Sequence, residues 1–154
     1  MGIRNIVKVG DDILRKKSRP VERFDAKLHR LLEDMAETMY KAEGVGLAAV
    51  QVGILRRIVV IDCGDGLLEL VNPEIIKSEG EQEDVEGCLS VPGRNGITRR
   101  PMKVTIKAQD RDGNWCVYQG EGLKARCFCH ELDHLDGVLF TDNMIKEVRI
   151  ECEE

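Results

Sequence analysis

The segment His130-Glu131-Leu132-Asp133-His134 constrains this chain more than any other. Histidines four positions apart lie on one face of a helix, one turn from each other, so both imidazoles can reach a single cation. Glu131 follows the first histidine and can act as a general base toward a water molecule at that cation. The chain has 3 histidines, and two of them are in this segment. The segment therefore predicts a helix that carries a metal site.

Apolar residues around the motif indicate that this helix is buried. Four large apolar side chains give it a surface for packing: Leu123, Phe128, Leu132 and Leu135. We expect a helix over residues 122–135 that closes at Gly137. A solvated polar face with a coincidental histidine pair is the alternative. Two buried histidines without a ligand would need other hydrogen-bond partners, so the metal site is the better interpretation.

The remaining pattern consists of short strands and one further helix. Leucines and methionines recur at helical spacing over residues 25–42, with Asp25 as the N-cap and Gly44 as the terminator. Strand patterns occupy residues 58–63, 68–71, 103–108 and 115–118. Residues 74–85 are acidic and alternate weakly, as in an exposed strand pair or loop. These patterns predict an α+β fold, in which antiparallel sheets pack around the central helix with the histidine motif and an N-terminal helix.

Length and charge limit the class of protein. With 154 residues the chain has the size of one domain, so we expect a single domain over residues 1–154. No apolar run approaches the roughly 18 residues of a membrane-spanning helix. Residues 1–8 lack the apolar core of a signal peptide, so we expect a cytoplasmic protein. The net charge of −5 argues against nucleic acid as the main partner.

The third metal ligand is sought among the cysteines, because a catalytic tetrahedral site takes three protein ligands and leaves one position open. Cys127 is about 10 Å of helix rise from His134, and Cys129 points away from His130. Three other cysteines have simpler interpretations: Cys63 and Cys116 as buried thiols in strands, and Cys152 in a charged tail. Cys88 lies between a glycine and a Ser-Val-Pro-Gly turn, where the backbone can pass close to a ligand. A structural thiol beside a turn is an equally simple interpretation.

Three segments, taken in order, resemble the peptide deformylase family. They are Gly44-Val45-Gly46-Leu47-Ala48-Ala49-Val50-Gln51, Glu86-Gly87-Cys88-Leu89-Ser90 and the histidine segment at 130–134. Residues 10–15 and 136–140 also match, so the resemblance covers about residues 3–145. It implies a metal-dependent hydrolase that removes the N-formyl group from the N-terminal formylmethionine of newly synthesised polypeptides. Departures include Cys129, where the family usually has glutamine.

The resemblance also implies a catalytic role for particular residues. The metal ligands would be Cys88, His130 and His134. They would hold one divalent ion, Fe(II) in the first place, with zinc, nickel or cobalt as alternatives. Glu131 would be the general base. The backbone N–H of Leu89 and the side-chain amide of Gln51 would stabilise the oxyanion.

The substrate residues follow from the same resemblance. Val45, Gly46 and Gly87 would align the peptide backbone through main-chain hydrogen bonds. An apolar pocket for the methionine side chain would be lined by Val45, Leu123, Cys127 and the stem of Arg126. Leu123 and Cys127 can be helix core at the same time. The expected partners are N-formyl-methionyl nascent peptides, with transient proximity to the ribosome, and neither nucleic acid nor membrane is expected to bind directly.

Two other functions fit part of the pattern. A metalloendopeptidase shares the His-Glu-x-x-His helix, but it usually completes its site with histidine or glutamate and needs a long peptide cleft. A protein of this fold that only binds peptides or stores a metal is the non-enzymatic alternative. Turnover of formyl-Met-Ala-Ser distinguishes all three functions.

Overall fold

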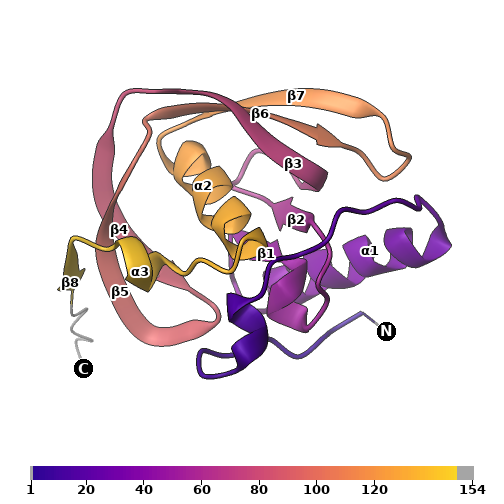
Figure 1. Cartoon of the computed structure of the whole chain (residues 1–154), viewed down its shortest axis with the longest axis horizontal. Helices are drawn as coiled ribbons and strands as arrows, with labels where there is room; N and C mark the ends of the chain where they lie inside the picture. Colours follow the sequence, from indigo (N-terminus) through magenta and orange to yellow (C-terminus); the bar gives the residue numbers. More distant parts are fainter. Residues whose placement is uncertain (1, 149–154) are drawn as a thin grey trace.

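A computed structural model of the chain describes residues 2–148. The helical elements are η1 (Asp12–Arg15), α1 (Ala26–Lys41), η2 (Ala49–Val52), α2 (Leu123–Leu135) and α3 (Phe140–Asn143). The strands are β1 (Gly46–Ala48), β2 (Ile58–Ile61), β3 (Leu68–Glu79), β4 (Gln82–Cys88), β5 (Val91–Arg100), β6 (Lys103–Gln109), β7 (Trp115–Glu121) and β8 (Lys146–Val148). Two antiparallel sheets have the orders β1-β2-β3-β6-β7 and β4-β5-β8, and α2 lies between them (Figure 1). The predicted α+β fold around a central helix is confirmed.

Strand β2 is buried on both faces, which explains its uninterrupted apolar sequence. Val59 and Ile61 pack in one hydrophobic cluster with Phe128 of α2. Ile58 and Val60 point the other way, into a second cluster with the leucines and methionines of α1. Because successive side chains of a strand alternate between faces, a strand between two helices must be apolar at every position. Helix α2 is thereby fixed against the sheet.

The predicted helix ends are close to the observed ones. Asp25 is the N-cap of α1, and its side chain accepts a hydrogen bond from the Leu28 N–H at 3.1 Å. The left-handed residue after α1 is Glu43, with φ 59°, rather than the expected Gly44. Gly137 ends α2 with φ 76°, and a Cβ there would collide with the Arg15 carbonyl, so only glycine fits.

Two strands are longer than expected. β3 continues past Val71 because Asn72 adopts φ 51° in a bulge, and its side chain bonds both the N–H and the carbonyl of Val21. Most of the Ser-Val-Pro-Gly turn predicted over residues 90–93 belongs to β5, which begins at Val91. The chain turns earlier, between Cys88 and Val91, which pair across a tight hairpin. Cys88 is therefore held at the end of a strand.

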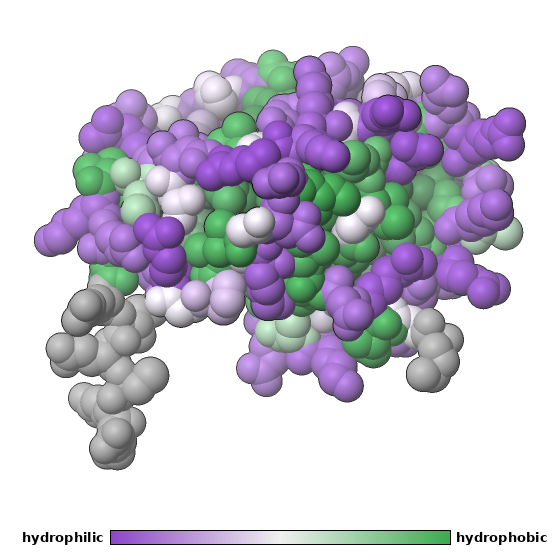
Figure 2. All heavy atoms as spheres, turned by 60° about the horizontal axis from the view of Figure 1, so that its bottom comes forward, coloured by the Kyte–Doolittle hydropathy of each residue, from purple (hydrophilic) through white to green (hydrophobic). Residues whose placement is uncertain are grey.

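The surface is mainly hydrophilic at its periphery. On the face in Figure 2, hydrophilic side chains project around the edge, and hydrophobic residues lie between them in the centre. No helix within residues 2–148 combines the length and apolar composition needed to cross a membrane. Cys63 and Cys116 are half-buried, so the prediction of fully buried thiols is wrong. Cys152 lies outside the described residues.

Candidate active site

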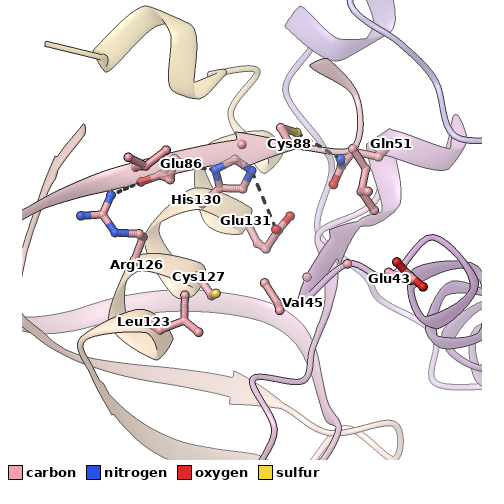
Figure 3. A pocket seen from close by; sticks show the side chains of 15 residues that line it. Glu43, Val45, Gln51, Glu86, Cys88, Leu123, Arg126, Cys127, His130 and Glu131 are labelled. Carbon is pink, nitrogen blue, oxygen red and sulfur yellow. Dashed lines mark hydrogen bonds and ion pairs between the residues drawn. The ribbon is translucent and has the colours of Figure 1, made fainter. Parts of the chain in front are cut away.

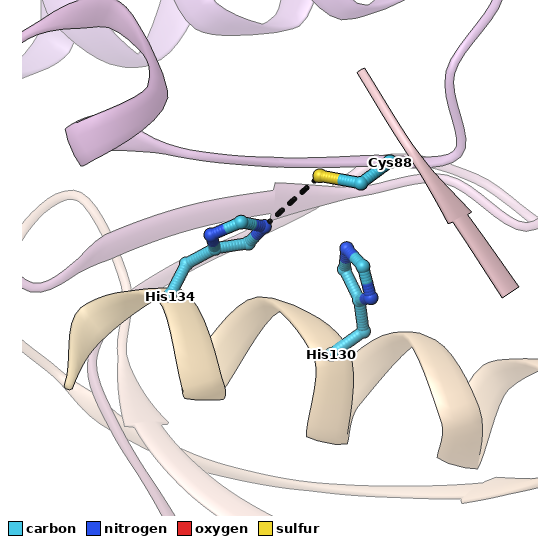
Figure 4. Close-up of side chains that lie close together, drawn as sticks. All are labelled: Cys88, His130 and His134. Atoms are coloured by element: carbon cyan, nitrogen blue, oxygen red, sulfur yellow. Dashed lines mark hydrogen bonds between the residues drawn. The ribbon is translucent and has the colours of Figure 1, made fainter. Parts of the chain in front are cut away.

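The three predicted metal ligands lie together. His130 and His134 are on successive turns of α2, and Cys88 reaches them from the end of β4 (Figure 4). One donor atom from each lies within 4.8 Å of the other two, and Cys88 Sγ is 3.3 Å from His134 Nε2. Two ligand atoms of one tetrahedrally coordinated ion such as zinc lie about 3.5 Å apart. Residues 46 positions apart therefore form one candidate metal site.

The electrostatics of the cluster fit a bound cation. Burial lowers the pKa of His134 well below its usual value, which keeps the imidazole in its neutral, metal-binding form. Burial would also lower the pKa of His130, but interactions with Glu131, Cys88 and Glu86 outweigh it and raise the pKa well above its usual value. The cluster thus favours positive charge at this point. A thiolate with two imidazoles suits a divalent transition metal.

Glu86 orients His130 from behind. Its Oε1 accepts a hydrogen bond from His130 Nδ1 at 2.8 Å, which leaves Nε2 facing Cys88 and the pocket (Figure 3). Arg100 donates two hydrogen bonds of 2.9 Å to the same carboxylate, and Arg126 donates one of 2.6 Å. Burial would raise the pKa of Glu86, but the hydrogen bonds from Arg100 and His130 hold it well below its usual range. Glu86 is the anionic centre of this buried network.

Replacing Glu86 by glutamine should destabilise the fold strongly. The change removes the negative charge opposite two buried arginines, and breaking a buried ion pair costs about 3–5 kcal/mol. The matched control is Glu83→Gln on the same strand, where Glu83 pairs with Arg99 at the surface at 3.0 Å. An exposed pair of this kind contributes about 1 kcal/mol or less. Urea unfolding of both variants measures the difference, and equal losses would contradict the role given to Glu86.

The same comparison has a defined pH dependence. Because the folded pKa of Glu86 is depressed, its stabilising effect is complete above the ordinary glutamate pKa of about 4.3. The effect is lost as the pH falls from there toward the folded pKa. The difference in the free energy of unfolding between the wild type and Glu86→Gln should therefore be constant from pH 6 to 8. It should become smaller below about pH 4.

Glu131 lies at the inner end of the pocket. Its Oε2 is 3.9 Å from His130 Nε2, and its buried Oε1 has no hydrogen-bond partner within residues 2–148. Burial raises its pKa to about 7. A Cβ at Gly46 would stand 2.5 Å from Glu131 Oε2, so this glycine makes room for the carboxylate. From the sequence, Gly46 was expected only to align the peptide backbone, so this second role was not predicted.

Gln51 extends from η2 to the other side of Cys88. Its Oε1 accepts a hydrogen bond from the Ala48 N–H at 2.9 Å, which fixes the direction of the amide. Its Nε2 then lies 3.5 Å from Cys88 Sγ and 3.1 Å from Ser90 Oγ. Gln51 is only 1% exposed, so this N–H group is held rigidly beside the candidate ligands. Leu89 follows Cys88 in the hairpin turn and is half-buried.

A pocket of about 340 Å³ opens in front of these residues (Figure 3). Its lining consists of Glu43, Gly44, Val45, Gly46, Gln51, Val85, Glu86, Gly87, Cys88, Leu89, Leu123, Arg126, Cys127, His130 and Glu131. All six predicted substrate residues are among them. Leu123 is 55% exposed, so the helix-core interpretation is wrong for it, whereas Cys127 is 5% exposed and is both core and lining. The Arg126 guanidinium turns away to Glu86, which leaves its stem toward the pocket.

Four residues of this lining were not predicted from the sequence. Gly44 and Glu86 were given no role at the site, although each begins one of the segments that resemble the family, and Glu43 and Val85 were not considered. The available signal for Glu86 was its position, because it is an acidic residue two positions before the candidate ligand Cys88, in a strand of a buried site. Glu43 and Val85 gave no such signal.

The sequence of the chain is similar to known deformylases over nearly its whole length. The model of the polypeptide deformylase family matches residues 3–149. A peptide deformylase of Caldicellulosiruptor bescii is 59% identical over 148 residues, which are 96% of this chain and 89% of that protein. The peptide deformylase of Alkaliphilus metalliredigens is 56% identical over 96% of this chain and 100% of its own length.

Solved structures agree with the sequence comparison. Peptide deformylase from Thermotoga maritima superposes with a TM-score of 0.91 at 41% identity, over 94% of this chain and 99% of that one. The enzyme from Synechococcus elongatus, solved in complex with actinonin, gives 0.90 at 40% identity, over 94% of this chain and 80% of that one. Both the sequence and the fold around the Cys-His-His cluster are thus those of one family. The chain belongs to the polypeptide deformylase family.

Proposed function

We propose that this deformylase removes the formyl group from N-formylmethionine at the start of new polypeptides, with Cys88, His130 and His134 as metal ligands and Glu131 as the base. The observation that supports this assignment is the position of the Glu131 carboxylate, beside three converging donor atoms at the inner end of a pocket. Both sheets and α2 contribute to the site, so we propose that the chain works as one catalytic domain.

The donor set fits one divalent ion. A metal ion there would supply a Lewis acid that polarises the formyl carbonyl and lowers the pKa of water. We propose Fe(II) as this ion, with zinc, nickel and cobalt as alternatives that the same thiolate and imidazoles can bind. Metal analysis of protein purified from its own host identifies the ion.

Glu131 is suited to move a proton in both directions. A carboxyl group with a pKa of about 7 can accept a proton from water at neutral pH and return it to the leaving amine. Its lack of a hydrogen-bond partner in the described part of the chain leaves it free to do so. The rigid Gln51 amide and the backbone N–H of Leu89 are the proposed donors to the oxyanion.

Two open sheet edges are the proposed guides for the substrate backbone. β1 and β4 are edge strands of their sheets, and both line the pocket. The Asp62 N–H bonds the Val45 carbonyl at 2.8 Å, opposite it across β1 and β2. Because bonding alternates along an antiparallel pair, the N–H and C=O of the next residue, Gly46, turn toward the free edge. Gly46 can therefore pair with an extended peptide, and Gly87 is proposed to do the same from β4.

The pocket predicts the order of substrate preferences. Val45, Leu123 and Cys127 form an apolar lining of methionine size, so methionine→alanine in the peptide should cost about 10- to 200-fold in kcat/KM. Norleucine should be tolerated better, since it fills the same space. Acetyl in place of formyl should lower kcat/KM more than norleucine in place of methionine does, because the extra methyl group meets Leu89, Gln51 and Glu131. The measurement is kcat/KM on four matched tripeptides. Equal cleavage of acetyl-Met-Ala-Ser and formyl-Met-Ala-Ser would instead indicate a general aminoacylase.

The test of the function is release of formate from formyl-Met-Ala-Ser by metal-loaded protein. Cleavage of an internal peptide bond would indicate an endopeptidase, and tight binding without turnover would indicate the non-enzymatic alternative. Since formylated chains arise on ribosomes, we propose a cytoplasmic enzyme that meets its substrate near the ribosome without binding nucleic acid or membrane directly.

A further inference from the structure

Two cysteines far apart in sequence touch beside the pocket. Cys63 directly follows Asp62 at the end of β2, and Cys127 is on the second turn of α2. Their sulfur atoms are 3.5 Å apart, although the residues are separated by 64 positions. The proposed reaction at the Cys-His-His cluster uses neither thiol. Their contact is a second feature of the molecule that needs an explanation.

The two thiols lie between two hollows of different kinds. Cys127 is 5% exposed and lines the active-site pocket, where its sulfur points inward (Figure 3). Cys63 is half-buried and lines a more open hollow of about 540 Å³, shared with residues 119–121 and with Lys124. Leu123 lines both hollows. A small reagent can therefore reach Cys63 from outside without passing the metal site.

The contact makes the two sulfurs chemically unequal. The Cys63 and Cys127 thiols are in hydrogen-bond contact, in which Cys63 Sγ donates to Cys127 Sγ, and this contact lowers the pKa of Cys63 although burial opposes it. The ammonium group of Lys124 acts in the same direction as the hydrogen bond, against the carboxylates of Asp65 and Asp62. The same bond, together with burial, raises the pKa of Cys127. Cys63 is thus the accessible, more easily ionised thiol, and Cys127 is the protected one.

We propose that Cys63 and Cys127 form a reversible disulfide when the protein meets hydrogen peroxide, and that this bond alters the pocket for the first side chain of the substrate. The Cys63 thiolate attacks one peroxide oxygen, the O–O bond breaks, and the released hydroxide takes up a proton to become water. The Cys127 sulfur then attacks the Cys63 sulfenic acid, the S–O bond breaks, and a second water leaves with the Cys127 proton. Two thiols and one peroxide give one disulfide and two waters. A small dithiol reverses the reaction by exchange.

The geometry allows this bond with small movements. The sulfurs must approach from 3.5 Å to about 2.05 Å, which rotation of the two side chains and a slight shift of the loop after β2 can provide. The movement draws the Cys127 sulfur toward Cys63 and away from its present place in the pocket lining. Cys88 belongs to β4, and His130 and His134 lie on later turns of α2 than Cys127, so all three ligands should stay in place. The expected effect is a change in KM with little change in kcat.

The consequence for catalysis rests on the proposed function, whereas the disulfide itself does not, so the two are measured separately. The nickel-loaded enzyme is treated with one equivalent of hydrogen peroxide and digested with trypsin without reduction. Mass spectrometry should find residues 58–77 joined to residues 127–146. Chymotrypsin, which cuts after Phe128, should assign the bond to Cys127 and not to Cys129. KM for formyl-Met-Ala-Ser should rise about tenfold, and dithiothreitol should restore it.

Two variants make the test selective. Cys63→Ser should have the basal activity of the wild type, form no cross-linked peptide, and keep its KM in peroxide. Cys116→Ser removes another half-buried thiol and should behave like the wild type in every respect. Absence of the cross-linked peptide overturns the disulfide, and an unchanged KM in cross-linked enzyme overturns its effect on the pocket. A KM rise in Cys63→Ser also overturns the proposal. Inactivity before any peroxide is added would instead contradict the proposed function.

Discussion

Replacing Glu131 by glutamine is expected to lower kcat/KM by about 10²- to 10⁴-fold while the bound metal and the fold remain. Glutamine has nearly the shape of glutamate, but its amide cannot accept a proton from water or deliver one to the leaving amine. The wild-type Oε1 has no hydrogen-bond partner within residues 2–148, so the change breaks no bond there that holds the structure together. The loss should therefore come from the chemistry and not from misfolding.

The measurement is kcat/KM for formyl-Met-Ala-Ser, with metal content and urea unfolding determined on the same samples. Glu83→Gln serves as the control, because Glu83 makes only a surface pair with Arg99 on the same molecule. That variant should keep normal turnover. Near-normal turnover of metal-replete Glu131→Gln would exclude Glu131 as the base and move the proton-transfer role to another group.

Cys88→Ala and His134→Ala should each lose nearly all of the bound metal, from about one ion per chain in the wild type. Three protein ligands complete an open tetrahedral site, and removal of one leaves two, which hold an ion far more weakly. Cys88 and His134 approach within 3.3 Å from different elements of the fold, so neither can be replaced by a neighbour. Elemental analysis after dialysis against a weak chelator measures the effect.

The controls are two other thiols. Cys127→Ala removes a cysteine from the same helix, and Cys116→Ala removes a half-buried one from β7. Both should keep the metal. Full occupancy in Cys88→Ala would show that the ion is held elsewhere, and loss of metal in Cys127→Ala would indicate a different ligand set.

The parts of the site that depend on local pattern could be predicted from the sequence. The two histidines share a helical face because of helix geometry alone, and the apolar residues of α2 identified it as a buried helix. The strand patterns predicted over residues 103–108 and 115–118 correspond to β6 and β7. The alternation rule also accounts for β2, although only the structure shows that α1 and α2 cover its two faces.

The remaining features depend on contacts between residues that are far apart in the sequence, and local sequence patterns do not predict such contacts. Glu86 meets Arg100, Arg126 and His130 only because the β4–β5 sheet packs on α2. A carboxylate among charged residues otherwise suggests a solvated surface. The length of β5 was not predicted for another reason. Pro92 and Gly93 normally indicate a turn, but here an irregularity in the pairing of β4 with β5 accommodates them within the strand.

The edges of β1 and β4, which pair with no further strand within residues 2–148, would set the range of proteins that one such enzyme can serve if they guide the peptide as proposed. Exposed strand edges usually promote aggregation, because they pair with strands of other molecules. Here both edges line the pocket, where a passing chain would engage them. A main-chain edge bonds groups that every amino acid has, while alternate side chains of the bound peptide point away from it. Under this proposal, selection is confined to the first residue and its acyl group, so one enzyme can serve nascent chains that differ at later positions.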